Sequence, residues 1–164
     1  MPLTAEREAL IRRYEDGPAK LRAAWDRVPP EARKWRPVEG KWSPHEVVCH
    51  AADSEANAYA RIRFLATEKS PTIQGYDQAD WARKLDYHSA PVERAFATVD
   101  AVRASTAELL RRLPESVWSA AGTHTETGGR YTGDDWLRIY AEHLEKHTRQ
   151  IERVLEAWTA RSGA

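Results

Sequence analysis

Four stretches of this chain repeat apolar residues at intervals of three and four, which is the period of a helix with one buried face. They run from about Thr4 to Val28, from Ser43 to Leu65, from about Pro91 to Leu113 and from near Thr132 to Trp158. No segment shows convincing strand alternation over several residues. Each apolar stripe must be buried against another element, so the pattern predicts an all-α fold, an antiparallel four-helix bundle.

Local sequence signals mark the beginnings of the second and fourth helices. Ser43-Pro44-His45-Glu46 is a Ser-x-x-Glu capping box with proline at the first helical position. Thr132, followed three residues later by Asp135, can cap the open amides at the start of the fourth helix.

Three segments interrupt the helical pattern. Gly17-Pro18 falls inside the first stretch and predicts a kink or two shorter helices, because proline has no N–H with which to continue a helix. The connection Lys69–Ala90 is too irregular to assign to helix or strand. The connection Trp118–Arg130 is polar and glycine-rich, which predicts a loop with room for a short hairpin.

Length and composition narrow the class of protein. A chain of 164 residues can bury a core by itself, so residues 1–164 are expected to form one domain. Lys plus Arg and Asp plus Glu both total 25, and this balance argues against nucleic acid or an anionic membrane as the main partner. Without a long apolar run, a signal peptide or a second cysteine, the chain is expected to be cytoplasmic.

His143 and His147 are the residues that point most directly to chemistry. They lie four residues apart, so on a helix their rings share one face. A rotation of about 100° per residue places both in the centre of the fourth apolar stripe. Buried imidazoles need partners for both ring nitrogens, and hydrogen bonds to a neighbouring helix are one solution. A shared metal ion is the solution we favour, because helical His pairs at this spacing commonly bind metals.

A third ligand must come from another element, and His50 is the best candidate. It lies at the edge of the apolar face of the second helix, beside a polar line formed by Asp53, Asn57 and Arg61. A residue in that position faces core on one side and polar groups on the other. We therefore predict one divalent metal ion held by His50, His143 and His147.

The other histidines and the cysteine are less suitable ligands. His45 lies in the first turn of its helix and projects elsewhere. His88 and His124 fall in the connections, where exposure is expected. Cys49 is rotated by about 100° from His50 and is expected to be a small buried hydrophobe.

Three neutral nitrogen ligands leave a coordination position open, which is typical of catalytic rather than structural metal sites. Such an ion can activate water or deprotonate a thiol. The zinc-protease pattern H-E-x-x-H is excluded, because Leu144 follows His143 and Glu145 projects to the opposite side. Asp53 is then the nearest candidate for a general base, or alternatively for a residue that orients a ligand.

The sequence resembles a known family in several separated segments. These are Gly40-Lys41-Trp42-Ser43, Glu46, His50, Asp53, the stretch Asn57-Ala58-Tyr59 with Arg61, Pro71-Thr72-Ile73, Tyr76-Asp77, Trp81 and the His143/His147 pair. Together they resemble the DinB-like superfamily, and within it the YfiT group, whose members are named metal-dependent hydrolases. The similarity spans roughly residues 18–158.

The resemblance implies a four-helix bundle, often a homodimer, with a three-histidine site for zinc or nickel. By position, the ligands would be His50, His143 and His147. Some members of the superfamily are thiol S-transferases that use bacillithiol, mycothiol or glutathione. Close relatives often have additional histidines where this chain has Cys49, Lys146 and Gln150, so a wider histidine cluster is not expected here.

Three functions follow as hypotheses. The first is transfer of a low-molecular-weight thiol to an electrophilic small molecule, which needs no separate strong base. Asn57 and Arg61 would then contact substrate, and Arg61 or Arg63 could hold a carboxylate of the thiol. The second is hydrolysis by metal-activated water, for which Asp53 is a weak base candidate. The third is a non-catalytic bundle that binds metal or a partner protein in a stress response.

Overall fold

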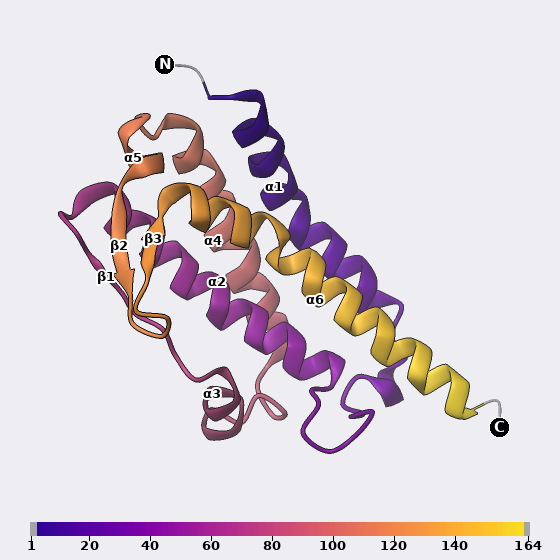
Figure 1. Ribbon diagram of the computed structural model, residues 1–164. Helices are drawn as coiled ribbons and strands as arrows, with labels where there is room; N and C mark the ends of the chain where they lie inside the picture. Colours follow the sequence, from indigo (N-terminus) through magenta and orange to yellow (C-terminus); the bar gives the residue numbers. More distant parts are fainter. Residues whose placement is uncertain (1–2, 163–164) are drawn as a thin grey trace.

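The computed structural model describes residues 3–162, and most of them are helical (Figure 1). Four long helices form the body of the molecule: α1 (Ala5–Asp26), α2 (Pro44–Thr67), α4 (Val92–Arg112) and α6 (Gly133–Ser162). Shorter elements occupy the connections: a 3-10 turn (Pro30–Ala32), α3 (Gln78–Lys84), α5 (Ser116–Ser119) and the strands β1 (Thr72–Ile73), β2 (Ala121–His124) and β3 (Arg130–Thr132). The predicted four-helix bundle is confirmed.

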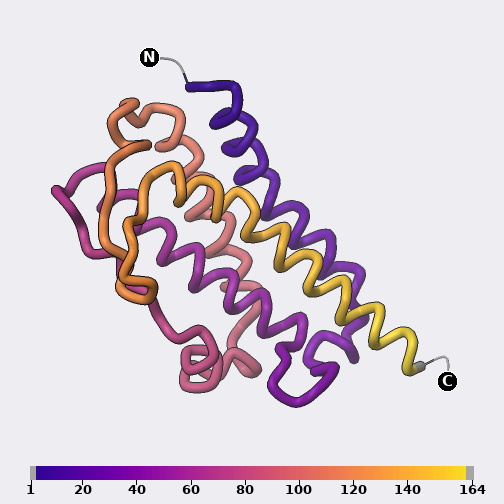
Figure 2. The backbone as a smooth tube through the Cα atoms, in the orientation of Figure 1, coloured from indigo at the N-terminus to yellow at the C-terminus, as the bar shows by residue number. Residues whose placement is uncertain are grey.

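The four long helices pack around a common core in the order α1, α6, α2 and α4, with α4 returning to α1. Figure 1 shows α1 and α6 running in one direction and α2 and α4 in the other. The contacts α1–α4 and α2–α6 are therefore antiparallel, whereas α1–α6 and α2–α4 are parallel. Residues 68–91 connect the parallel pair α2 and α4, and Figure 2 shows this segment passing along the side of the bundle.

A small sheet lies beside the end of the bundle where α2 and α4 finish. Its strand order is β1-β2-β3, with β1 parallel to β2 and β2 antiparallel to β3. The strands β2 and β3 form the short hairpin that the sequence allowed in the connection Trp118–Arg130. β1 has only two residues, which is too short to show a period, and the sequence therefore did not predict it.

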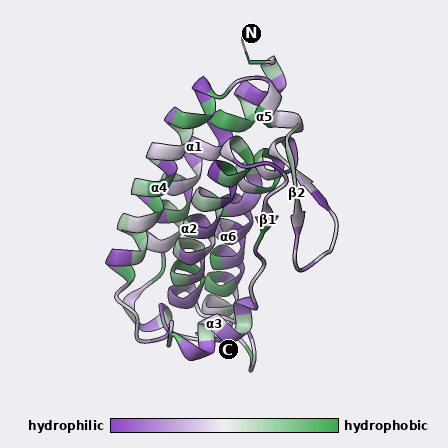
Figure 3. Ribbon diagram, turned by 90° about the vertical axis from the view of Figure 1, so that its left-hand side faces the viewer, coloured by the Kyte–Doolittle hydropathy of each residue, from purple (hydrophilic) through white to green (hydrophobic). Residues whose placement is uncertain are grey.

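The long helices bury one face each, as their apolar stripes predicted. Hydrophilic and hydrophobic residues alternate around them in Figure 3. One core cluster lies towards the sheet and includes Trp118 and Trp136, and a second lies towards the other end and includes Trp25 and Phe96. No helix within residues 3–162 combines the length and the apolar character that crossing a bilayer requires.

Helix α1 continues without a break through Gly17-Pro18, so the expectation of two shorter helices was wrong. Proline at position 18 leaves the carbonyl of Tyr14 without its usual helical donor. The guanidinium of Arg103, on α4, donates to that carbonyl from Nη1. A residue on a neighbouring helix thus replaces the missing hydrogen bond and allows the helix to continue.

Gly17 lets Arg103 approach α1 this closely. A Cβ atom at position 17 would lie 2.8 Å from Arg103 Nη1 and 3.1 Å from the Cβ of Leu144. We expect Gly17→Ala to lower the free energy of unfolding by about 1–3 kcal/mol through overpacking, although alanine is the better helix former. Urea unfolding measures the change. The reverse substitution at exposed Ala19, Ala19→Gly, should cost only about 1 kcal/mol, and a Gly17→Ala variant more stable than wild type would contradict the packing argument.

Candidate metal centre

The three histidines singled out by the sequence meet between α2 and α6. His50 from α2 and His143 and His147 from α6 each offer a ring nitrogen, and these nitrogens lie within 4.8 Å of one another. Nε2 of His147 lies 3.0 Å from Nε2 of His143. The ring centroid of His50 is 4.8 Å from that of His147 and 5.9 Å from that of His143. The structure brings the predicted residues together, and their role as ligands stays a prediction.

The start of α2 fixes the position of His50. The hydroxyl of Ser43 accepts from the N–H of Glu46, and the Glu46 carboxylate accepts from the N–H of Ser43 at 2.9 Å. This is the capping box that the sequence predicted. His50 follows one turn after Glu46 and is only 2% exposed. The indole of Trp42 covers it, with ring centroids 4.7 Å apart.

A buried carboxylate that sequence reasoning missed orients His143. Oε1 of Glu55 lies 2.7 Å from His143 Nδ1, and the Glu55 side chain is fully buried. The guanidinium of Arg103 donates to both oxygens of Glu55, from Nε at 2.9 Å and from Nη2 at 2.7 Å. Burial by itself would raise the pKa of Glu55, but Arg103 and His143 together hold it below its usual value. A carboxylate in this position fixes the tautomer and direction of a metal-binding imidazole.

Gln150 orients His147 in the same manner. Its Oε1 lies 3.0 Å from His147 Nδ1, so that nitrogen carries the proton and Nε2 presents a lone pair. Gln150 occupies one of the positions where the family resemblance suggested a further histidine. The amide therefore takes over an orienting contact at the edge of the centre.

The donor set fits a metal ion. Ionised Glu55 can only accept a hydrogen bond, so His143 Nδ1 carries a proton, and in the neutral ring Nε2, like that of His147, presents a lone pair. Two lone pairs facing each other at 3.0 Å repel unless a proton or a metal ion lies between them. His50 Nδ1 is buried without a hydrogen-bond partner, so this ring also has a nitrogen that no group of the described chain uses. These properties match a nitrogen-ligand site for zinc or a similar ion.

Electrostatics keep two of the rings neutral. Burial, with smaller contributions from His147 and His143, lowers the pKa of His50 to about 2. Burial, with a smaller contribution from His143, lowers the pKa of His147 to about 3. Both imidazoles are therefore uncharged at neutral pH, which is the form that binds metals.

Asp53 and Asn57 make contacts other than those expected of a base and a substrate ligand. The carboxylate of Asp53 accepts from the hydroxyl of Tyr87 at 2.5 Å. The amide of Asn57 donates to the backbone carbonyl of Asp53 at 2.8 Å. Within residues 3–162, no hydrogen bond joins Asp53 to any of the three histidine rings, and the orienting role falls to Glu55 for His143. The predicted catalytic and substrate-binding roles of Asp53 and Asn57 stay predictions.

The remaining histidines are more buried than the sequence suggested. His124 is only 9% exposed because it lies on β2 and packs beside Tyr131, so its predicted exposure was wrong. His88 is half-buried. His45 is buried, and its Nε2 lies 2.8 Å from the backbone carbonyl of Ala90, away from the centre. Cys49 is buried, as predicted.

Comparison with known proteins agrees with this architecture. The DinB superfamily model matches residues 13–151. A protein of Oceanobacillus iheyensis named "putative metal-dependent hydrolase" is 34% identical over 112 residues. This match covers 68% of the present chain and 64% of the relative, which is less than two thirds of the relative's length. YfiT of Bacillus subtilis, which has the same designation, is 27% identical over 149 residues, with 91% of this chain and 84% of YfiT covered.

The solved structure of YfiT from Bacillus subtilis has the same fold. It superposes with a TM-score of 0.87 at 26% identity and covers 98% of this chain and 90% of YfiT. That structure is described as "a probable metal-dependent hydrolase with an unusual four-helix bundle topology". The mixture of parallel and antiparallel neighbours described above also departs from a simple up-and-down bundle.

Proposed function

The chain belongs to the DinB superfamily, and from this membership and the three clustered imidazoles we propose that it is a metal-dependent enzyme acting on a small molecule. His50, His143 and His147 would hold one divalent ion, with zinc and nickel the best matches to imidazole ligands. When bound, such an ion supplies acidity, which makes a thiol or a water molecule nucleophilic at neutral pH.

We propose thiol S-transfer to an electrophilic small molecule as the reaction. The observation that carries this choice is the state of the two carboxylates that follow His50 on α2. Glu55 is fully occupied by Arg103 and His143, and Asp53 accepts from Tyr87. Glu55 is therefore not free to take a proton, and Asp53, which Tyr87 contacts through one oxygen only, makes no hydrogen bond to any of the three histidine rings within residues 3–162. A thiol can release its proton to solvent before its sulfur attacks the electrophile, so S-transfer needs no such base.

Hydrolysis is the second candidate, and the names of the relatives favour it. It requires a proton acceptor beside the attacking water. Asp53, whose Oδ2 accepts from Tyr87, would have to accept from that water through its other oxygen. The arrangement of the carboxylates therefore supports S-transfer more directly than hydrolysis.

One set of assays distinguishes S-transfer from hydrolysis. The protein, purified without an affinity tag or added metal, should contain about one zinc or nickel ion per chain. It should accelerate conjugation of bacillithiol, mycothiol or glutathione to a fluorogenic electrophile such as monochlorobimane, and chelator-treated protein should not. Cleavage of activated esters or amides without a thiol would instead establish the hydrolase. If the chain took up no metal even when zinc or nickel was offered, the three histidines would be core residues and both enzymatic functions would be wrong.

A further inference from the structure

Arg61 is a half-buried guanidinium without an acidic partner. Its Nη1 donates to the hydroxyl of Tyr140 at 2.8 Å, and its Nη2 donates to the carbonyl of Gln74 at 2.5 Å. Its Nε is buried and has no hydrogen-bond partner. Within residues 3–162 no carboxylate oxygen lies within 4.0 Å of Arg61. Arg103, which donates to the backbone carbonyl of Tyr140 on α6, is by contrast neutralised by Glu55.

The surroundings of Arg61 contain further unused hydrogen-bonding groups. The hydroxyls of Tyr76 and Tyr131 are buried without partners. Burial raises the pKa of both phenols, and the positive charge of Arg61 acts on each in the opposite direction, so both lie within its electrostatic reach. Burial also lowers the pKa of His124, and Arg61 lowers it further. Arg61 therefore lies among these neutral groups and forms no ion pair within residues 3–162. Asp53 and Glu55 act on the same Tyr76, and Glu126 acts on the same His124.

An arginine that served only to tie helices together would leave this arrangement unexplained. Its two hydrogen bonds do connect α2 to α6 and to the segment after β1. That role does not account for the unused Nε or for two buried phenols without partners, each of which costs free energy. A carboxylate can accept from two guanidinium N–H groups at once and from a phenol, so an anion beside Arg61 would use donors that the chain itself leaves unpaired.

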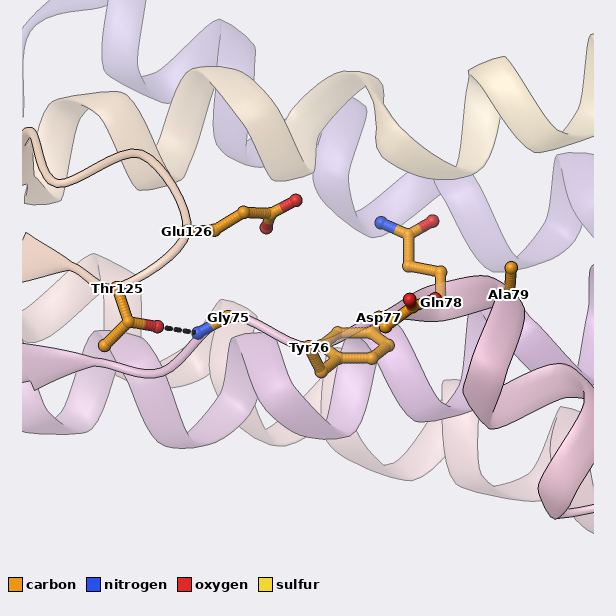
Figure 4. Close-up of a pocket in the computed structure, with 7 residues that line it drawn as sticks. All are labelled: Gly75, Tyr76, Asp77, Gln78, Ala79, Thr125 and Glu126. Atoms are coloured by element: carbon orange, nitrogen blue, oxygen red, sulfur yellow. Dashed lines mark hydrogen bonds between the residues drawn. The ribbon is translucent and has the colours of Figure 1, made fainter.

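Arg61 is connected to the candidate metal centre through Tyr140. Tyr140, which accepts from Arg61, has its ring centroid 5.6 Å from that of His143. Gln74 precedes Gly75 and Tyr76 in the wall of a cavity of about 590 Å³. The cavity is lined by Gly75, Tyr76, Asp77, Gln78, Ala79, Thr125 and Glu126, and Figure 4 shows Glu126 and Gln78 extending into it from opposite sides.

The charges of the cavity wall leave one place for an anionic group. Asp77 and Glu126 are the only charged residues that line it, and both are acidic. A carboxylate would be repelled from their side of the cavity and attracted to Arg61. The acidic residues thus restrict how an anionic molecule can lie, with its charge away from Asp77 and Glu126 and towards the guanidinium of Arg61.

We propose that Arg61 and Tyr140 form a subsite that binds the carboxylate of the small molecule on which the protein acts. If the proposed S-transfer holds, this molecule is a thiol that bears a carboxylate, and the subsite selects it over neutral thiols. The identity of the ligand as a thiol rests on the proposed function. The anion subsite itself rests on the contacts of Arg61 and can be tested separately.

A matched pair of sulfur-free probes tests the subsite. N-acetyl-L-alanine should bind the purified full-length protein about tenfold more tightly than N-acetyl-L-alaninamide, as measured by NMR titration, because a charge-assisted contact contributes that much. Arg61→Gln should abolish the preference, and Tyr140→Phe should weaken it. Arg63→Gln is the matched control, since Arg63 lies on the same helix but donates to the carbonyl of Tyr59 and stacks on its ring. Equal affinities for acid and amide, no binding of the acid, or a preference retained in Arg61→Gln would overturn the proposal.

Conjugation kinetics then separate this proposal from the proposed function. With N-acetyl-L-cysteine as the thiol, Arg61→Gln should raise KM about tenfold, whereas KM for N-acetyl-L-cysteinamide should not change. A wild-type protein that conjugates neither thiol but still prefers N-acetyl-L-alanine over its amide would contradict S-transfer and keep the anion subsite. A protein that conjugates both thiols with equal KM would keep S-transfer and exclude the subsite.

Discussion

Arg103→Met is expected to lower the free energy of unfolding by about 3–5 kcal/mol, because it leaves a buried carboxylate without its counter-ion. Glu55 is completely buried, and Arg103 is its only cationic partner within residues 3–162. The same substitution removes the guanidinium that donates to the carbonyl of Tyr14, which Pro18 leaves without its usual helical donor. Domains of this kind are stable by only about 5–15 kcal/mol, so chemical unfolding should show a large shift of the midpoint.

Two further variants decide whether burial of the charge is the cause. Arg111 lies on the same helix and pairs with Glu15 at the surface, so Arg111→Met should cost less than about 1 kcal/mol. The double variant Glu55→Leu, Arg103→Met removes both buried charges and should be more stable than Arg103→Met alone. If Arg103→Met were no more harmful than Arg111→Met, the ion pair would contribute little and our account of this part of the core would fail.

The helices could be predicted from the sequence, but their directions could not. Each apolar stripe is a local property with a period of 3.6 residues, and α2 and α4 lie where the stripes placed them. The direction of α4 depends on residues 68–91, which carry the chain back along the bundle before α4 begins. That segment contains a two-residue strand and a seven-residue helix, and neither is long enough to show a period.

The failure at Gly17-Pro18 shows the limit of local rules. Proline inside a helix is expected to break it, since one hydrogen bond is lost. Here the replacement donor is Arg103, which is 89 residues away in the sequence. No window around position 18 contains that information. Gly17 and Pro18 together predict an interruption, although the structure shows that the glycine provides space for the guanidinium.

The histidine cluster could be predicted from the sequence, because the spacing of residues along a helix determines which side of the helix each one faces. His143 and His147 lie four residues apart and therefore share one face of the helix, and His50 lies at the edge of an apolar stripe. Glu55 and Arg103 were missed, yet each left a trace in the sequence. Each is a charged residue inside an apolar stripe, Glu55 three residues before Ala58 and Arg103 four residues after Val99. A charge in that position on each of two helices predicts a buried pair.

Glu55 makes the fold and the candidate metal centre depend on each other. One carboxylate neutralises Arg103, which completes α1, and also sets the tautomer of His143. A change at Arg103 should therefore disturb the histidines even if the chain still folds. Metal binding should in turn stabilise the fold, since a ligand that binds only the native state adds to its stability.

His143→Ala is expected to lower the affinity for the metal more than 100-fold. Loss of a group that merely orients a ligand costs about 10–100-fold, so loss of a ligand itself should cost more. Elemental analysis of the purified variant should find the chain without bound zinc or nickel. Stoichiometric metal in His143→Ala would show that our assignment of the ligands is wrong.

Two companion variants make the result specific. His45→Ala removes a histidine of comparable burial whose Nε2 faces the carbonyl of Ala90, so the metal should be retained even if stability falls. Glu55→Gln keeps the shape of the side chain but removes the charge that fixes His143, and its affinity should lie between the other two. This order of metal affinities separates direct ligation from a general loss of packing. If cavity formation alone lowered the affinity, His45→Ala and His143→Ala would lose it to a similar extent. Glu55→Gln, which forms no cavity, would then stay close to wild type.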